Sequence, residues 1–251
     1  MTEEILRKPF RLPCEVVLPN RICKTATSEH LAHPITGEPL KAMVELYRAW
    51  AEGGSGLIIT GNVMVDEHLE GPGNVICRST TPSAIWREWA EASKTCRKGS
   101  QERPVAIVQL SHPGRQSPPS VSLRRPVAPS NVPFRLPGVG IQLFRSPRTL
   151  TTEEVKALPT KFANAAALAV AAGFDGVQIH AAHGYLLSQF LSPHTNRRSD
   201  SYGGSAANRR RLLLEILAAI RIASQLLVTP WAFIERPLEP GACCLSRREG
   251  N

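Results

Sequence analysis

The chain has 251 residues, of which 42% are hydrophobic and 20% are charged. This is the composition of an ordinary globular protein with a sizeable core. The formal net charge of +9 suits a phosphate-bearing ligand, but no aromatic-interleaved basic stripe accompanies it, so we expect no nucleic-acid partner. No apolar run approaches the roughly 20 residues that span a bilayer, and the N-terminal segment MTEEILRKPF is too charged for a secretory signal. We therefore expect a cytoplasmic protein without a membrane partner.

The cysteines and the late arginines indicate the redox state and the surface of the protein. The six cysteines include no C-x-x-C pair, and a chain of this size does not need a disulfide scaffold, so we expect reduced thiols. The basic residues that cluster late in the chain are interpreted as solvated helix faces. They are Arg197, Arg198, Arg209, Arg210 and Arg211.

Short apolar runs alternate with longer helical patterns, which is typical of βαβ units and a parallel sheet. The apolar runs predict strands over residues 20–27, 56–65, 103–110 and 174–180. The helical patterns, several of which end on glycine or begin near proline, predict helices over residues 41–54, 82–99, 151–173 and 205–223. Four strand–helix units are therefore complete by about residue 223.

The last two predicted helices carry start signals. Thr151 or Thr152 precedes the acidic pair Glu153 and Glu154, which is the pattern of an N-cap followed by a favourable first turn. The sequence YGGS before the fourth helix is most simply a tight turn with a cap at Ser205.

Two segments interrupt the alternation. Residues 111–150 form a Pro/Ser/Arg-rich excursion after the third strand, and a loop of that length is usually functional or disordered. Residues 226–234 could form a further strand, but the prolines and glycine beyond them predict no fifth helix.

Two histidines and a tyrosine stand where the fourth predicted strand ends. His180 closes that strand, and His183 and Tyr185 follow in the loop. In α/β barrels functional groups lie at the carboxyl ends of the strands. Two imidazoles can donate hydrogen bonds to one carbonyl oxygen and stabilise the charge that develops there. A tyrosine with an ordinary pKa of about 10 is a neutral acid at physiological pH and could protonate a carbanion.

Other readings of the two histidines stay open. The H-x-x-H spacing is half of a possible metal site, which His194 or Asp200 would complete, although no acidic ligand has a recognisable metal-site spacing. Either imidazole could instead only form hydrogen bonds in the core, since buried polar groups generally find partners.

The segment HAAHGYLLSQFLSPHTNRRSDSYGGSAANRRRLLLE resembles the fourth-strand signature of the old yellow enzyme family, the FMN-dependent NAD(P)H:flavin oxidoreductases. Shorter matches occur in the same order on the first three predicted strands. They are LPNRICKTATSEH, GLIITGN and QLSHPGRQ. The resemblance covers about residues 6–223.

This resemblance implies a set of flavin contacts. The end of the first strand lies against the flavin in the family, and Ser28 stands where relatives have a threonine or cysteine that tunes it. Asn62 stands where a small residue usually touches the flavin ring, and Gln109 matches the glutamine that hydrogen-bonds its pyrimidine side. The first-strand residues are Thr25, Ala26, Thr27 and Ser28.

The resemblance also assigns the substrate side. His180 and His183 match the pair that holds the substrate's carbonyl or nitro oxygen, and Tyr185 matches the proton donor. His30 stands where some relatives have an aromatic residue that contacts substrate.

Three further positions have structural readings. His112 and Arg115 belong to QLSHPGRQ, and a structural role in that loop is as well supported as ligand contact. Ala207 stands where a glutamate commonly precedes the Asn-Arg pair, which we interpret as a structural loss.

The implied activity is that of an ene-reductase. FMN, reduced by NADH or NADPH, would deliver hydride to the activated C=C bond of an α,β-unsaturated carbonyl compound, in a pathway of specialised metabolism. The expected partner is therefore a small electron-poor alkene. Two alternatives remain: a flavin-free, non-catalytic remnant or accessory protein, and a non-redox isomerase or cyclase that uses the same pocket.

The implied fold is a (β/α)8 TIM barrel of which the chain carries about four units. Residues 1–223 would form the N-terminal part of this FMN-binding barrel, with residues 111–150 as a long βα-loop insertion. Residues 224–251 are a divergent tail. The family's fifth-strand arginine and phosphate loops have no counterpart before Asn251, which we interpret as a frame change, an altered splice, a misplaced stop or a truncation.

Four parallel strands would leave two open edges and an inner face without an opposing half. We therefore expect apolar strand residues such as Ile107 and Val177 to lack part of their packing. Two copies could complete a barrel across a shared interface, so a homodimer is a further hypothesis.

Overall fold

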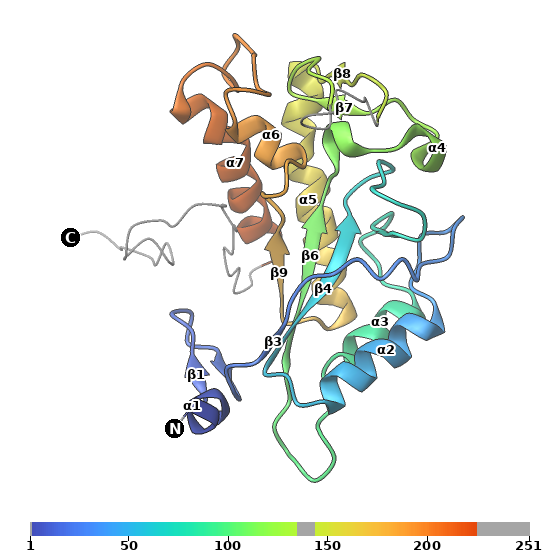
Figure 1. Cartoon of the computed structure of the whole chain (residues 1–251), viewed down its shortest axis with the longest axis vertical. Coiled ribbons are helices and arrows are strands. Elements are labelled where there is room, and N and C mark those ends of the chain that lie inside the picture. Colours follow the sequence, from blue (N-terminus) through green and yellow to red (C-terminus); the bar gives the residue numbers. More distant parts are fainter. Residues whose placement is uncertain (1, 135–143, 225–251) are drawn as a thin grey trace, which may run out of the picture.

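A computed structural model describes residues 2–134 and 144–224. Its centre is a parallel sheet whose strands follow one another in the order β3, β4, β6, β9, with β5 paired to the end of β4 (Figure 1). This confirms the predicted α/β class with parallel strands. The strands are β3 (Cys23–Lys24), β4 (Leu57–Met64), β5 (Val75–Ile76), β6 (Val105–Ser111) and β9 (Gly176–Ile179).

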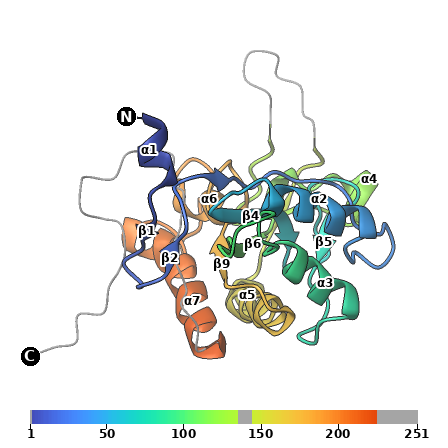
Figure 2. The same cartoon turned by 90° about the horizontal axis from the view of Figure 1, so that it is seen from below.

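Four longer helices accompany the sheet. Figure 2 shows α3, α5 and α7 along one face of the strands β4, β6 and β9, with α2 beside α3. Tyr47 of α2, Trp89 of α3, Phe162 of α5 and Ile216 of α7 are all buried in the core between helices and strands. The helices are α2 (Lys41–Glu52), α3 (Ala84–Ala92), α5 (Thr152–Ala172) and α7 (Ala206–Ser224).

The strand period of two separates the two faces of β6. Ala106, Val108 and Leu110 belong to the helix-facing core, so Ile107 and Gln109 turn to the opposite face. The expectation that Val177 lacks packing is wrong, because it is 3% exposed within the same core. Ile107 is outside that core cluster but is also only 4% exposed.

The first strand is shorter than the predicted range of 20–27. Only Cys23 and Lys24 pair with β4. Further along β4, the backbone N–H of Gly61 donates to the side chains of Glu29 and Tyr47, at 3.1 and 3.0 Å. Side chains thus take a backbone donor of β4 that a longer strand pairing would use, and residues 25–31 form no helix or strand.

The second helix is also shorter than predicted. It ends at Ala92 rather than near residue 99. The Ser93 hydroxyl donates to the Trp89 carbonyl at 2.7 Å, and such a side-chain bond competes with continuation of the helix.

Several short elements carry too little periodicity to be predicted. Three of them, η1, α4 and β7, lie in the segment after β6, whose residues 135–143 are outside the described part. The strand expected over residues 226–234 is also outside it. The short elements are α1 (Thr2–Arg7), β1 (Phe10–Arg11), β2 (Val17–Leu18), η1 (Gly114–Gln116), α4 (Pro119–Ser122), β7 (Val127–Ala128), β8 (Arg148–Thr149) and α6 (Leu186–Leu191).

The interpretation of the late arginines as solvated is wrong for Arg198. Its side chain is 7% exposed and pairs with Asp200. It also donates to the Pro129 and Leu150 carbonyls, at 3.2 and 2.5 Å. Arg198 therefore joins the loop before α7 to the segment before α5.

Two further sequence predictions can be compared with the described residues. The cysteines at 14, 23, 77 and 96 are free thiols, as expected. Over residues 2–134 and 144–224, no helix is both long and apolar enough to cross a bilayer.

The start of α5 confirms the predicted cap. The Thr151 hydroxyl accepts the Glu154 N–H at 3.2 Å, and the Glu154 carboxylate accepts the Thr151 N–H at 2.8 Å, which completes a capping box. Ser205 accepts the Asn208 N–H at 3.2 Å at the start of α7.

We predict that Thr151→Ala lowers the free energy of unfolding by about 1 kcal/mol, because it leaves a helix N–H without its cap. Urea denaturation followed by circular dichroism measures this. Lys156→Ala, an exposed change in the same helix, is the control and should stay within about 0.5 kcal/mol of wild type. Equal stabilities for the two variants would contradict the assigned cap.

Candidate active site

Three carboxamide side chains form a row across neighbouring strands. Asn62 on β4 is opposite Gln109 on β6, and Gln109 is opposite Gln178 on β9. The side-chain Nε2 of Gln109 donates a hydrogen bond to the side-chain Oε1 of Gln178 at 2.5 Å. Because parallel strands hold equivalent residues side by side, the row follows from strand pairing. It lies just before the carboxyl ends of the strands.

His180, His183 and Tyr185 cluster at the same edge. The ring centroids of His180 and His183 are 5.0 Å apart, and those of His180 and Tyr185 are 4.9 Å apart. His183 and Gly184 both have left-handed backbone, with φ of 54° and 70°. This conformation is uncommon for residues other than glycine, and here it turns the chain between β9 and α6, whose N-cap is Tyr185.

Hydrogen bonding fixes the tautomer of His180. Its Nδ1 accepts the Ala182 N–H at 3.2 Å, so in the neutral ring Nε2 carries the hydrogen and is a donor. Burial, and then the neighbouring His183, lower the pKa of His180 to about 4 against the opposing charge of Glu70. His180 is therefore neutral at physiological pH and still has one N–H to offer.

Tyr185 is held in its neutral form. Burial, followed by the charge of Glu70 and a hydrogen bond to it, raises the pKa of the Tyr185 phenol well above its ordinary value. The Glu70 carboxylate also accepts hydrogen bonds from the Ser28 hydroxyl and, at 2.6 Å, from the Asn62 amide. One carboxylate thus contacts Ser28 and Asn62, for which the resemblance implies flavin contact, and Tyr185, for which it implies the role of proton donor.

The residues after β3 are arranged in different ways. The Lys24 ammonium lies 4.2 Å from the ring centroid of Trp50 on α2. It also lies 3.0 Å from the backbone carbonyl oxygen of Ile59 on β4. Thr25 and Thr27 are exposed, whereas Ala26 and Ser28 are half-buried. Of the predicted first-strand contacts, Ser28 is the one that the described hydrogen bonds join to the cluster.

His30 contacts the loop between β4 and β5, residues 65–74, which we call the β4–β5 loop. Its Nδ1 lies 2.7 Å from the Pro72 carbonyl oxygen, and its φ of 56° is again left-handed. A Cβ on Gly73 would lie 2.4 Å from the His30 carbonyl oxygen. Glycine is therefore required for this close approach, and His30 helps to hold the loop that carries Glu70.

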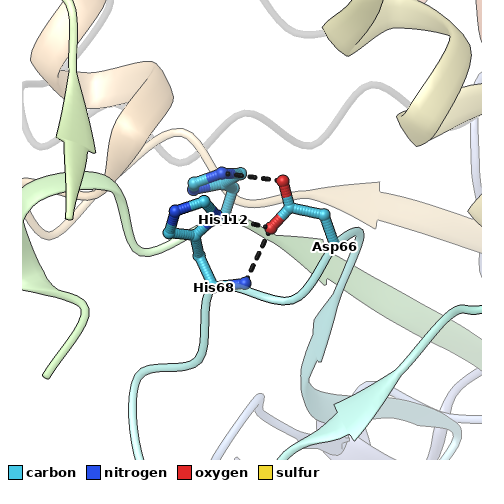
Figure 3. A group of neighbouring side chains, drawn as sticks. All are labelled: Asp66, His68 and His112. Carbon is cyan, nitrogen blue, oxygen red and sulfur yellow. Dashed lines mark hydrogen bonds and ion pairs between the residues drawn. The ribbon is translucent and has the colours of Figure 1, made fainter. Parts of the chain in front are cut away.

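A second polar cluster, Asp66, His68 and His112, anchors the other end of the β4–β5 loop (Figure 3). The Asp66 carboxylate lies 3.0 Å from His68 Nδ1 and 3.3 Å from His112 Nε2. Lys161 of α5 adds a contact of 2.8 Å. Burial opposes the charge on Asp66, but His112 and His68 outweigh burial and lower the pKa of this carboxyl far below its usual range.

The same three side chains offer ligand atoms within 4.8 Å of one another, yet their hydrogen bonds argue against a metal site. His112 Nδ1 accepts the Gly114 N–H at 3.0 Å, so the hydrogen of the neutral ring is on Nε2, the atom that faces Asp66. His68 lies between two acceptors, Asp66 and the Arg125 carbonyl, and both its nitrogens can donate when the ring is protonated. The cluster is thus satisfied as an ion-paired hydrogen-bond network.

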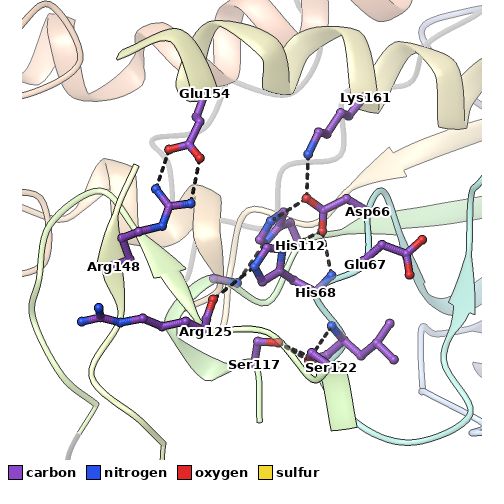
Figure 4. Close-up of polar contacts among 12 residues, drawn as sticks. Asp66, Glu67, His68, His112, Ser117, Ser122, Arg125, Arg148, Glu154 and Lys161 are labelled. Carbon is purple, nitrogen blue, oxygen red and sulfur yellow. Dashed lines mark hydrogen bonds and ion pairs between the residues drawn. The ribbon is translucent and has the colours of Figure 1, made fainter. Parts of the chain in front are cut away.

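Figure 4 shows how this network ties loops to the sheet and to α5. Ser117 and Ser122 hold Leu69 through its carbonyl, at 2.8 Å, and its N–H, at 3.0 Å. His112 therefore has a structural role in the described contacts, as does Arg115, which donates to the Val132 carbonyl at 3.3 Å. The β4–β5 loop is consequently fixed on both sides of Glu70.

The H-x-x-H metal site, left open as an alternative by the sequence, has no support from these contacts. Asp200, one proposed completing ligand, is occupied by Arg198 and by the Thr152 hydroxyl at 2.9 Å. Within the described residues, the group with metal-ligand spacing is Asp66, His68 and His112, not His180 and His183.

Three side chains of the two polar clusters were not predicted from the sequence. Gln178 had a usable signal, because it stands two residues before His180 and so shares its face of the strand. Glu70 and Asp66 had none, since their positions depend on the path of the β4–β5 loop.

A family profile described as NADH:flavin oxidoreductase / NADH oxidase matches residues 6–229. The chain belongs to this family. Its sequence is 40% identical over 236 residues to the NADH-dependent flavin oxidoreductase iliE of Neonectria sp., covering 85% of this chain and 29% of the relative. It is 41% identical over 214 residues to the NADH-dependent flavin oxidoreductase nadA of Aspergillus parasiticus, covering 80% of this chain and 46% of the relative. The chain thus spans less than half the length of these two curated relatives.

Solved old yellow enzymes have the same fold. The homologue from Zymomonas mobilis superposes with a TM-score of 0.73 at 32% identity, over 87% of this chain and 60% of that one. The old yellow enzyme from Trypanosoma cruzi superposes with a TM-score of 0.75 at 26% identity, over 89% and 64%. The five-stranded sheet is therefore part of a TIM-barrel fold, as the resemblance implied.

The residues at the sheet edge fit the flavin of this family. Asn62 Oδ1 is buried and has no hydrogen-bond donor among the described residues, and the same holds for Ser111 Oγ at the end of β6. A flavin's pyrimidine ring offers both an N–H donor and carbonyl acceptors. The carboxamide row of Asn62, Gln109 and Gln178 would match that pattern from neighbouring strands.

We predict that Asp66→Asn lowers the free energy of unfolding by about 3 kcal/mol at neutral pH, because it leaves a buried ion-pair network without its anion. The contribution is complete above the ordinary pKa of 3.8 and is lost as the pH falls below it. Glu67→Gln is the control, since its pair with Arg78 is 40% exposed and is worth about 1 kcal/mol or less. Urea denaturation of both variants measures the difference, and equal losses would contradict the anchoring role.

We predict that the His180 imidazole titrates near pH 4 rather than near its ordinary pKa of 6.5. NMR of the chain with 13C-labelled histidine measures this, with His180→Gln assigning the resonance. Because the unfolded chain binds this proton more readily, stability should fall as the pH drops from 6.5 through 4. A midpoint at or above about 6 would contradict the buried, neutral ring.

Proposed function

We propose that the chain binds FMN at the carboxyl edge of the sheet and uses NADH or NADPH to reduce the activated C=C bond of a small α,β-unsaturated carbonyl compound. The observation that carries the proposal is His180, whose Nδ1 accepts a hydrogen bond and whose Nε2–H has no acceptor among the described contacts, beside His183 and Tyr185. An oxygen atom that accepts hydrogen bonds from both rings would lie next to a phenol.

The two imidazoles would hold the substrate carbonyl. His180 Nε2–H donates without a net charge, so it binds a neutral carbonyl and strengthens its hydrogen bond as negative charge develops on the oxygen. His183 is exposed at the same edge and its backbone is pinned, since its carbonyl accepts a 2.9 Å bond from Gln116. The backbone of His183 and the ring of His180 are thus held in place before substrate arrives.

The redox chemistry would come from the cofactor, because no side chain here can supply a hydride. When bound, FMN reduced by NAD(P)H would supply the hydride that the β-carbon of the substrate receives. The carboxamide row binds and orients the ring, with Asn62 Oδ1 as the acceptor that still needs a donor. Tyr185 keeps its proton at neutral pH and holds it ready for the α-carbon.

The relatives support this activity without defining its substrate. The relatives from Neonectria sp. and Aspergillus parasiticus are NADH-dependent flavin oxidoreductases, and morphinone reductase is among the structural neighbours, with a TM-score of 0.72 at 28% identity. The proposal for this chain rests on its own residues, since it spans only part of each relative.

We predict that the purified chain quenches FMN fluorescence on binding and then oxidises NADH or NADPH in proportion to an added enone. Tyr185→Phe should leave flavin reduction intact and slow alkene reduction by roughly 100-fold or more. His180→Ala should weaken enone use, while His194→Ala, an exposed histidine beyond α6, should not. Absence of FMN binding would overturn the proposal, and an isomerised product without consumption of the nicotinamide would favour the non-redox alternative.

A further inference from the structure

Glu70 is an acidic side chain in the middle of the candidate site. Its carboxylate accepts hydrogen bonds from Ser28 and Asn62, which come from the segment after β3 and from β4. It also lies against Tyr185, beyond β9. We propose that Glu70 is the positioning and proton-return partner of Tyr185. This inference rests on the proposed function, since it concerns the proton donor of that reaction.

The carboxylate is held by contacts on both sides of it. The Asn74 side chain, 4% exposed, accepts the N–H groups of Glu70 and Gly71 at 3.0 and 2.9 Å. Ser117 and Ser122 hold Leu69 from the other side. Four hydrogen bonds therefore fix the backbone around Glu70, and Ser28 and Asn62 fix its side chain.

The partners of Glu70 in the described contacts are neutral. A hydroxyl, a carboxamide and a phenol surround the carboxylate, and none of the ion pairs found among residues 2–134 and 144–224 includes Glu70. Other acids of the same loop behave differently, since Asp66 pairs with Lys161 and Glu67 pairs with Arg78. An anion without a cation partner among the described contacts acts on its titratable neighbours, which here are Tyr185 and His180.

This arrangement gives the phenol a local proton source. Tyr185 breaks its O–H bond as a new C–H bond forms at the α-carbon of the substrate. The Glu70 carboxylate takes a proton from solvent and passes it to the resulting phenolate, so that Glu70 ends as the carboxylate that accepts hydrogen bonds from Ser28 and Asn62. The net proton comes from solvent, and both side chains return to their starting forms.

A purely structural role for Glu70 predicts different behaviour. In that case a neutral isostere that keeps the contacts with Ser28 and Asn62 would leave the acidity of Tyr185 unchanged. Glu70→Gln is such an isostere, and Glu67→Gln is its matched control three residues away on the same loop. Tyr185→Phe identifies the phenol signal.

The first experiment needs neither flavin nor substrate. The chain is labelled with 13Cζ-tyrosine, and the resonance of Tyr185 is followed by NMR up to the highest pH at which circular dichroism shows the folded state. Removing the nearby negative charge should raise the ionisation constant of Tyr185 about tenfold or more in Glu70→Gln, with no change in Glu67→Gln. A Tyr185 resonance that is indistinguishable between Glu70→Gln and wild type overturns the proposal.

The second experiment tests proton return during turnover. In the FMN-loaded chain, Glu70→Gln should reduce enones more slowly, with a loss in kcat that grows as the pH rises, because protons must then come directly from a solvent that holds fewer of them. Reduction of the flavin by NADH should stay at the wild-type rate. A kcat that equals the wild-type value at every pH overturns the proton-return role of Glu70 and leaves the proposed function intact. Failure of the wild-type chain to bind FMN overturns the proposed function, and the NMR result still decides whether Glu70 controls Tyr185.

Discussion

Parallel pairing of β4, β6 and β9 is the constraint on which the candidate site depends. It places Asn62, Gln109 and Gln178 side by side and brings the ends of three strands to one edge. The helices α3, α5 and α7 stabilise the sheet from one face only (Figure 2), so polar residues can occupy the other. Burial of the apolar half of each strand thereby leaves an ordered row of amides on the opposite face.

The β4–β5 loop adds charge to this neutral row. Asp66 attaches one end of the loop to His68, His112 and Lys161, and Asn74 fixes the other. Glu70, between them, therefore has little freedom to move away from Tyr185. The two acidic residues have separate tasks: Asp66 pairs with the Lys161 ammonium and holds the loop in place, whereas Glu70 has neutral partners among the described contacts and acts on Tyr185.

How much the sequence predicted depended on the range of the interactions. The strands β4, β6 and β9 and the helices α2, α5 and α7 were predicted because each has a clear local period. His180, His183 and Tyr185 were grouped correctly because six residues of chain and a strand end hold them together. The β3 strand was overestimated because the side chains of Glu29 and Tyr47, far apart in sequence, take a donor from β4. Glu70 was missed because its place depends on the fold of a loop that has no periodicity.

The proposed function requires the carboxamide row, extended by His180, to be a flavin-binding surface. A crystal structure of the chain grown with FMN tests it most directly. The claim predicts that the flavin ring lies against Asn62, Gln109 and Gln178 and gives Asn62 Oδ1 a hydrogen-bond donor. A flavin bound elsewhere, or crystals in which Asn62 Oδ1 faces no ligand at FMN concentrations that saturate related flavoproteins, would contradict it.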